Sequence, residues 1–132
     1  KLENRIYIKR EDLQPVFSFK IRGAYNKLKN LSKLELDRGV IAASAGNHAQ
    51  GVALAAHTLH VKAVIVMPVT TPEIKVQAVG ARANVILHGD TYDEAYSHAI
   101  EISKKRKMTF IHKFDDEDVI VGKGTVGYEI FT

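Results

Sequence analysis

The chain has 132 residues, of which 45% are hydrophobic and 26% charged, the balance of one ordinary globular domain. It has no cysteine, which excludes disulfides, thiolate metal sites and cysteine nucleophiles. No apolar run approaches the roughly 20 residues that span a bilayer, and the net charge of +4 comes from scattered basic residues. We therefore expect a cytoplasmic protein that binds neither membrane nor nucleic acid.

The first candidate elements lie near the amino end. The run IYIKRE (6–11) has the character of a strand, and SFKIRGAYNKL (18–28) predicts an amphipathic helix that begins at Lys20. Lys20 stands between Phe19 and a run of small residues. A lone lysine is most often a solvated surface charge, so its role has to be judged from the rest of the chain.

Four β-branched runs follow, at residues 39–44, 62–68, 84–89 and 109–114. They are nearly continuous in apolar character, as expected of strands that are covered on both faces. Helical patterns lie between them, at residues 47–59, 71–81 and 91–107, and the last begins with a capping box, Thr91 to Glu94. This alternation predicts an α/β fold: an open parallel sheet of about four strands with helices on both faces.

The junction AASAGNHAQG (42–51) leaves the first of these strands and enters a helix at about Asn47. Ligands of open α/β sheets bind beyond the carboxyl ends of the strands, and free N–H groups at a helix start suit an anion. A plain capped turn is the alternative, because Ser and Asn are common N-cap residues. The junction alone does not decide between the two.

Lys20 in SFKIRGA and Asn47 in SAGNHAQG are 27 positions apart, and together they resemble the pyridoxal-phosphate enzymes of the tryptophan-synthase β-like fold (fold type II). Among these the chain is most similar to the threonine/serine dehydratases, in particular the biosynthetic threonine dehydratases. The similar stretches are residues 9–25, 43–53, 64–81, 86–95 and 122–130.

The resemblance implies a role for each matching residue. Lys20 would be bonded to the aldehyde carbon of pyridoxal 5'-phosphate and would then transfer protons. Phe19 would lie against the pyridine ring, and Asn47 would hydrogen-bond the ring hydroxyl. The substrate carboxylate would be held, mostly through backbone N–H groups, by Ser44, Ala45, Gly46, Asn47 and His48.

The implied reaction is deamination of L-threonine to 2-oxobutanoate and ammonia, the first step towards isoleucine, in a homotetramer. The alternatives are a serine-preferring dehydratase or another β-elimination enzyme with the same cofactor, and a non-catalytic isolated domain. Racemases that resemble this family carry a serine where this chain has Ala45, and alanine has no hydroxyl to deliver a proton. Elimination is therefore expected rather than racemisation.

Other polar residues are interpreted as structural. The family has Gly-Gln-Gly-Thr where this chain has Gly122-Lys123-Gly124-Thr125, which we interpret as a solvated turn in which the side chain at 123 has no assured polar role. The acidic run 115–118 is likewise interpreted as a turn. His57 and His60 have a spacing that can chelate, but no third ligand is indicated, so no metal is expected.

Residues 1–32 carry the cofactor lysine and are expected to pack on a larger domain, and to be exposed, mobile or exchanged without it. Residues 33–132 are expected to form a small open α/β domain that is truncated at its carboxyl end. The chain begins at Lys1 and stops in GYEIFT, a pattern typical of a helix start. Because the family's glycine-rich phosphate loop lies beyond this point, we expect the 132 residues alone to be inactive or nearly so.

Overall fold

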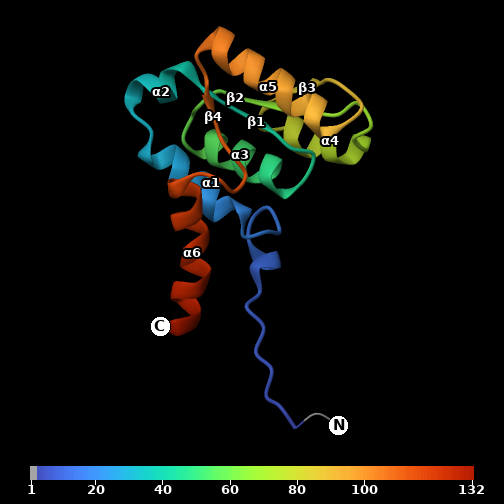
Figure 1. The fold of residues 1–132 in the computed structure, drawn as a ribbon. Helices are drawn as coiled ribbons and strands as arrows, with labels where there is room; N and C mark the ends of the chain where they lie inside the picture. Colours follow the sequence, from blue (N-terminus) through green and yellow to red (C-terminus); the bar gives the residue numbers. More distant parts are fainter. Residues whose placement is uncertain (1–2) are drawn as a thin grey trace.

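Four parallel strands form the centre of the structure, a computed structural model that describes residues 3–132 (Figure 1). The strands are β1 (Val40–Ala43), β2 (Ala63–Met67), β3 (Asn84–Leu87) and β4 (Thr109–Phe110). Their order is β3-β2-β1-β4, with Val40 beside Ala63 on one side and Thr109 on the other. The predicted open parallel sheet is confirmed.

Helices cover both faces of this sheet, as the alternating pattern predicts (Figure 1). The helices are α1 (Lys20–Asn30), α2 (Lys33–Arg38), α3 (Asn47–Thr58), α4 (Glu73–Gly80), α5 (Tyr92–Arg106) and α6 (Glu117–Phe131). Successive strand residues point to opposite faces, so Ala42 and Ile65 pack with α1, α3 and α4, whereas Ile41 and Val64 pack with α5. The capping box at the start of α5 is also confirmed.

The fourth strand is shorter than the predicted 109–114. Its last ladder bond runs from the Ile111 N–H to the Ile41 carbonyl, at 2.8 Å. The chain then turns, because His112 Nδ1 accepts hydrogen bonds from the N–H groups of Phe114 and Asp115. This turn lies at the carboxyl edge of the sheet, beside the end of β1.

The turn predicted at 122–125 is wrong, because this stretch lies in the middle of α6. The turn predicted at 115–118 is correct only for residues 115 and 116, which form a bend, because α6 begins at Glu117. Asp116 caps this helix by accepting the N–H of Val119 at 3.2 Å, and acidic residues in the first turn favour the helix dipole. α6 packs along α1, and both α6 and the amino-terminal segment project from the same side of the layer (Figure 1).

The strand predicted at 6–11 is also wrong. Residues 3–10 are extended but pair with no strand, and residues 11–13 form a single 3₁₀ turn, η1 (Glu11–Leu13). Ile6 and Tyr7 are 78% and 86% exposed. A strand needs a hydrogen-bonding neighbour, and this segment has none along residues 3–132. None of the helices in the described chain is long and apolar enough to cross a membrane.

Candidate active site

Lys20 is the first residue of α1, and its place is fixed by the two residues before it. The buried hydroxyl of Ser18 accepts the Lys20 N–H at 3.2 Å, which satisfies one of the free donors of the helix start. Phe19 is 38% exposed, and its ring centroid lies 5.4 Å from Lys20 Nζ. The amine therefore lies beside a half-exposed aromatic ring.

Gly51 on α3 brings Lys20 close to the turn that precedes that helix. A Cβ at this position would lie 3.2 Å from the carbonyl carbon and oxygen of Lys20 and from the N–H nitrogen of Ile21. A glycine therefore lets the two helix backbones approach more closely than any side chain would. Gly51 lies little more than one helical turn after Gly46, so the start of α1 packs beside the 44–48 turn.

The 44–48 turn presents free N–H groups rather than a capped helix start. Ser44 Oγ accepts the N–H of Gly46 at 3.2 Å, and Gly46, which has no side chain, is the N-cap. Within residues 3–132 the N–H groups of Ala45, Asn47 and His48 have no acceptor, and the exposed Asn47 side chain has no hydrogen bond. Such a helix start suits a carboxylate or a phosphate, which favours the anion-binding interpretation.

His48 points away from this opening and into the protein. It is 4% exposed, and its Nε2–H donates to the Ile111 carbonyl at 3.0 Å. Burial lowers its pKa to about 4, against the opposing effect of that hydrogen bond; the positive charges of Lys20 and Lys123 lower it further. The imidazole is therefore neutral near pH 7 and anchors α3 to the β4 edge, so only the His48 backbone N–H faces a ligand.

The sequence analysis did not assign Lys123 to this site. It is half-buried on α6, and its Nζ donates to the Lys113 carbonyl at 2.6 Å. Burial lowers the pKa of Lys123, and the positive charge of Lys20 lowers it further. The helical spacing of Val119 and Lys123, four residues apart, would have placed both on the α1 face had the stretch been predicted as a helix.

Arg22, near Lys20 on α1, links the amino-terminal segment to α1 and α6. Its guanidinium donates to both carboxyl oxygens of Glu11, at 2.9 and 2.8 Å, and to both of Glu129, at 2.7 Å each. Lys9 also pairs with Glu129. Hydrogen bonds from Arg22 and then Lys9 lower the pKa of Glu129 to about 2. The segment before α1 is therefore tied to α6.

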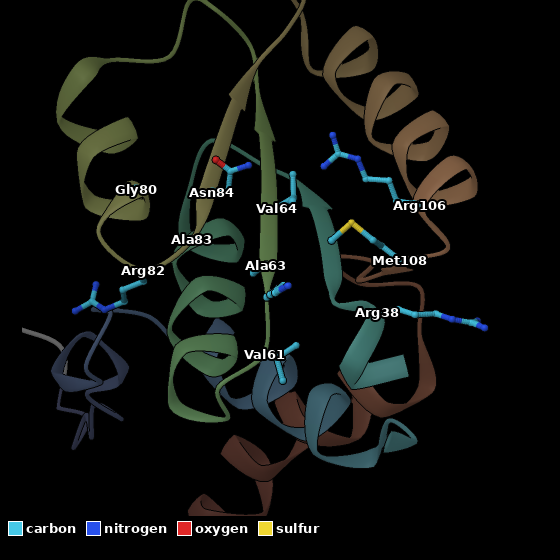
Figure 2. A pocket seen from close by; sticks show the side chains of 11 residues that line it. Arg38, Val61, Ala63, Val64, Gly80, Arg82, Ala83, Asn84, Arg106 and Met108 are labelled. Atoms are coloured by element: carbon cyan, nitrogen blue, oxygen red, sulfur yellow. The ribbon is translucent and has the colours of Figure 1, made fainter. Parts of the chain in front are cut away.

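Two other kinds of binding site, a metal site and a second pocket, are not supported by the structure. No group of three or more acidic or histidine side chains within residues 3–132 is placed to hold a metal. A hollow of about 590 Å³ lies at the opposite, amino ends of the strands, where Val64 and Asn84 line it. Four cationic side chains also border it, but Figure 2 shows Arg38 and Arg82 extending away from each other rather than towards a common point.

Comparisons with known proteins agree with this geometry. The family model described as pyridoxal-phosphate dependent enzyme matches residues 1–132. The chain is 60% identical over 131 residues to a threonine dehydratase of Nicotiana attenuata, covering 98% of this chain but 22% of that protein. It therefore spans less than a quarter of the length of that relative.

Two solved structures have the same fold. The processed form of threonine deaminase isoform 2 from Solanum lycopersicum superposes with a TM-score of 0.91 at 62% identity, covering 94% of this chain and 34% of that one. Maize serine racemase superposes with a TM-score of 0.89 at 32% identity, covering 93% and 38%.

Proposed function

Because the chain belongs to the family of pyridoxal-phosphate dependent enzymes, we propose that the protein containing it deaminates L-threonine to 2-oxobutanoate and ammonia. The observation that carries the proposal is the packing of the start of α1, where Lys20 lies, close to a turn with free N–H groups. The high identity to a threonine dehydratase supports the choice of substrate. We place the reaction at the start of isoleucine biosynthesis.

The residues present fit the aldehyde and ring of the cofactor. The Lys20 amine forms no ion pair within residues 3–132, which leaves it available to react with an aldehyde carbon. Phe19 offers a half-exposed ring, and Asn47 an unpaired amide, to the ring of the cofactor. When bound, pyridoxal phosphate supplies the electron sink for the bonds broken at the substrate α-carbon.

The chain's own residues would bind the substrate and move its protons. The free N–H groups of Ala45, Asn47 and His48 would hold the substrate carboxylate at the positive end of α3. Ser44 shapes this turn through its bond to Gly46. The Lys20 amine would take the proton from the substrate α-carbon. His48 would keep the turn in register with the β4 edge.

A serine-preferring dehydratase is the closest alternative, and racemisation is the next. Ala45 stands in the carboxylate turn and has no hydroxyl to protonate the opposite face of the α-carbon. We therefore propose elimination, despite the likeness in fold to a serine racemase. The rival from another class is a domain that binds anions at the 44–48 turn and does no chemistry.

We also propose that the amino-terminal segment packs on a larger domain of the full-length protein, with residues 33–132 as the smaller domain. The segment exposes several large apolar side chains: Ile6, Tyr7, Ile8, Leu13 and Phe17. Contiguous exposed apolar surface marks an interaction site. A cytoplasmic homotetramer is the assembly that we propose for the full-length protein, which gel filtration with light scattering can test.

The test compares the full-length protein with its Lys20→Ala variant and with Lys29→Ala, a matched loss of an exposed lysine on the same helix. We expect Lys20→Ala to abolish ammonia release from L-threonine and Lys29→Ala to leave it unchanged. Borohydride reduction with the cofactor bound should label Lys20 and none of the other twelve lysines. Turnover by Lys20→Ala, or label spread over other lysines, would refute the assignment; faster turnover of L-serine would favour the alternative substrate.

A further inference from the structure

We propose that Lys123 is a positioning residue for the substrate carboxylate, and that it acts through the turn after β4 (residues 111–115). The inference rests on the proposed function, in which the 44–48 turn holds that carboxylate. Lys123 lies on α6, and its amine donates to the turn after β4 rather than to the 44–48 turn. Two hydrogen bonds, one at Lys113 and one at His48, connect the helix to the carboxylate turn.

The first contact is the hydrogen bond from Lys123 Nζ to the Lys113 carbonyl, at 2.6 Å. The alkyl stem of Lys123 packs over Gly23 of α1, where a Cβ would lie 3.2 Å from the Lys123 Cγ. Both lysines are half-buried. A side chain whose stem is already packed loses little further freedom when its amine bonds, so this contact fixes the Lys113 carbonyl relative to α1 and α6.

The second contact joins the turn after β4 to the carboxylate turn. His48 Nε2–H donates to the Ile111 carbonyl at 3.0 Å, and the two residues are 4% and 1% exposed. The Ile111 N–H donates to the Ile41 carbonyl of β1 at 2.8 Å. Ile111 is therefore bonded both to the strand that leads into the 44–48 turn and to the first turn of the helix that follows it. A displacement of Ile111 moves His48, and with it the backbone N–H groups beside it.

One residue, His112, separates the two acceptor carbonyls of Ile111 and Lys113, and its conformation is fixed within the turn. Its Nδ1 accepts the N–H groups of Phe114 and Asp115 at 3.2 and 2.8 Å. Its ring also packs edge-on against the Phe114 ring, with the ring centroids 4.7 Å apart. A segment held by its own hydrogen bonds and packing transmits a displacement along its length, so a shift of the Lys113 carbonyl carries Ile111 with it.

Loss of the Lys123 donor should therefore loosen the N–H groups that hold the substrate carboxylate. The carboxylate is present in the bound substrate and in the transition state alike, so a contact to it affects KM more than kcat. This pattern distinguishes Lys123 from Lys20, whose loss should abolish turnover. It also differs from a general folding defect, which reduces the amount of active enzyme and thus the apparent kcat.

The test uses the full-length protein with its cofactor and compares Lys123→Met, which keeps the stem but removes the donor, with Lys123→Arg, which keeps both. We expect Lys123→Met to raise the KM for L-threonine about three- to tenfold, the range that corresponds to the loss of one hydrogen bond, with kcat changed by less than about twofold. Lys123→Arg should restore most of the wild-type KM. Lys29→Met, at an exposed lysine of α1, should leave both parameters unchanged.

Amide hydrogen exchange of the same proteins, followed by mass spectrometry, gives a readout that does not depend on turnover. The first hydrogen-bonded N–H groups of α3, at residues 50–52, should exchange faster in Lys123→Met than in wild type, whereas β3, at the far edge of the sheet, should be unchanged. Lys123→Gln keeps an N–H donor on a side chain that is one bond shorter and should give intermediate exchange and an intermediate KM, so the result does not depend on a single variant.

Exchange at residues 50–52 that is identical in wild type and Lys123→Met would overturn the proposal, as would a fall in kcat with no change in KM. Failure of the proposed function has a different signature. A wild-type protein that releases no ammonia from L-threonine would refute that function, and the exchange comparison would still decide whether Lys123 positions the 44–48 turn.

Discussion

Replacing Gly122 by alanine tests the contact that places α6 on α1. The new Cβ would lie 2.8 Å from the Gly23 Cα and from the Asn26 Cβ, and closer still to the Arg22 carbonyl oxygen. Two of these three obstacles are backbone atoms, which cannot swing aside as the end of a flexible side chain can. The two helices therefore have to separate, or α6 has to shift along its axis.

The expected effect is the balance of two terms. Alanine favours a helix interior over glycine by about 1 kcal/mol. Overpacking a tight contact costs about 1–3 kcal/mol, and a backbone obstacle belongs in the upper part of that range. We therefore expect Gly122→Ala to lower the free energy of unfolding by about 1–2 kcal/mol, as the difference between these two terms.

Gly124 on the same helix provides the matched control. A Cβ at that position meets nothing within 4 Å, so only the propensity term remains. Gly124→Ala should raise the free energy of unfolding by up to about 1 kcal/mol. Both variants are measured by urea unfolding of the purified chain. If Gly122→Ala were as stable as Gly124→Ala, the close packing of α1 and α6 would be refuted.

Three further changes probe the surroundings of the site. The depressed pKa of His48, about 4 against an ordinary 6.5, means that the unfolded chain binds its proton more tightly, so stability falls as the pH drops through 6.5 towards 4. The loss should reach about 2 kcal/mol at pH 5, and His48→Gln should flatten it in urea unfolding; equal slopes would contradict the burial. Asp116→Ala should cost about 1–2 kcal/mol through loss of the α6 cap, with Asp116→Asn milder because it keeps an acceptor oxygen; equal losses would assign the effect to the Lys27 ion pair instead. Arg22→Met should speed amide hydrogen exchange in residues 9–17 while leaving α3 unchanged, and unaltered exchange there would show that the link to Glu129 does not hold the segment.

The sheet could be predicted from the sequence because its strands are buried on both faces. The residues from Val40 to Ala43 and from Ala63 to Met67 are all buried, so each strand is an uninterrupted apolar run. The α5 capping box is local and needs no tertiary context. A second capping box, Ser32 to Glu35, marks the start of α2, a helix that the sequence analysis did not predict.

α6 could not be predicted in the same way. Three glycines lie in its interior, and each costs a helix about 1 kcal/mol relative to alanine, so local propensity indicates a turn. The helix forms because it packs on α1, where one of these glycines is required. The strand predicted at 6–11 failed for the converse reason: its pattern is right, but ion pairs of Lys9 and Glu11 hold the segment beside α6 and α1, where it has no strand to pair with.

In the candidate site, too, local features could be predicted from the sequence whereas features that depend on tertiary packing could not. The free N–H groups of the 44–48 turn follow from a strand that runs directly into a helix, and this much could be inferred from the sequence. The pairing of Lys20 with that turn came from a family resemblance, because no local pattern tells which helix packs against α3. The place of Lys123 depended on α6 and was therefore missed.

Lys20 is held from two sides by backbone contacts rather than by its own side chain. α3 approaches it at Gly51, and α6 approaches the same helix at Gly122. The first contact sets the distance from the start of α1 to the carboxylate turn, and the second sets the distance between α1 and α6. Both distances are possible only because glycine has no side chain. Substitutions at these glycines should therefore alter reactivity at Lys20 even though neither residue carries a reactive group. The position of the amine is thus encoded in α3 and α6 as much as in the SFKIRGA stretch itself.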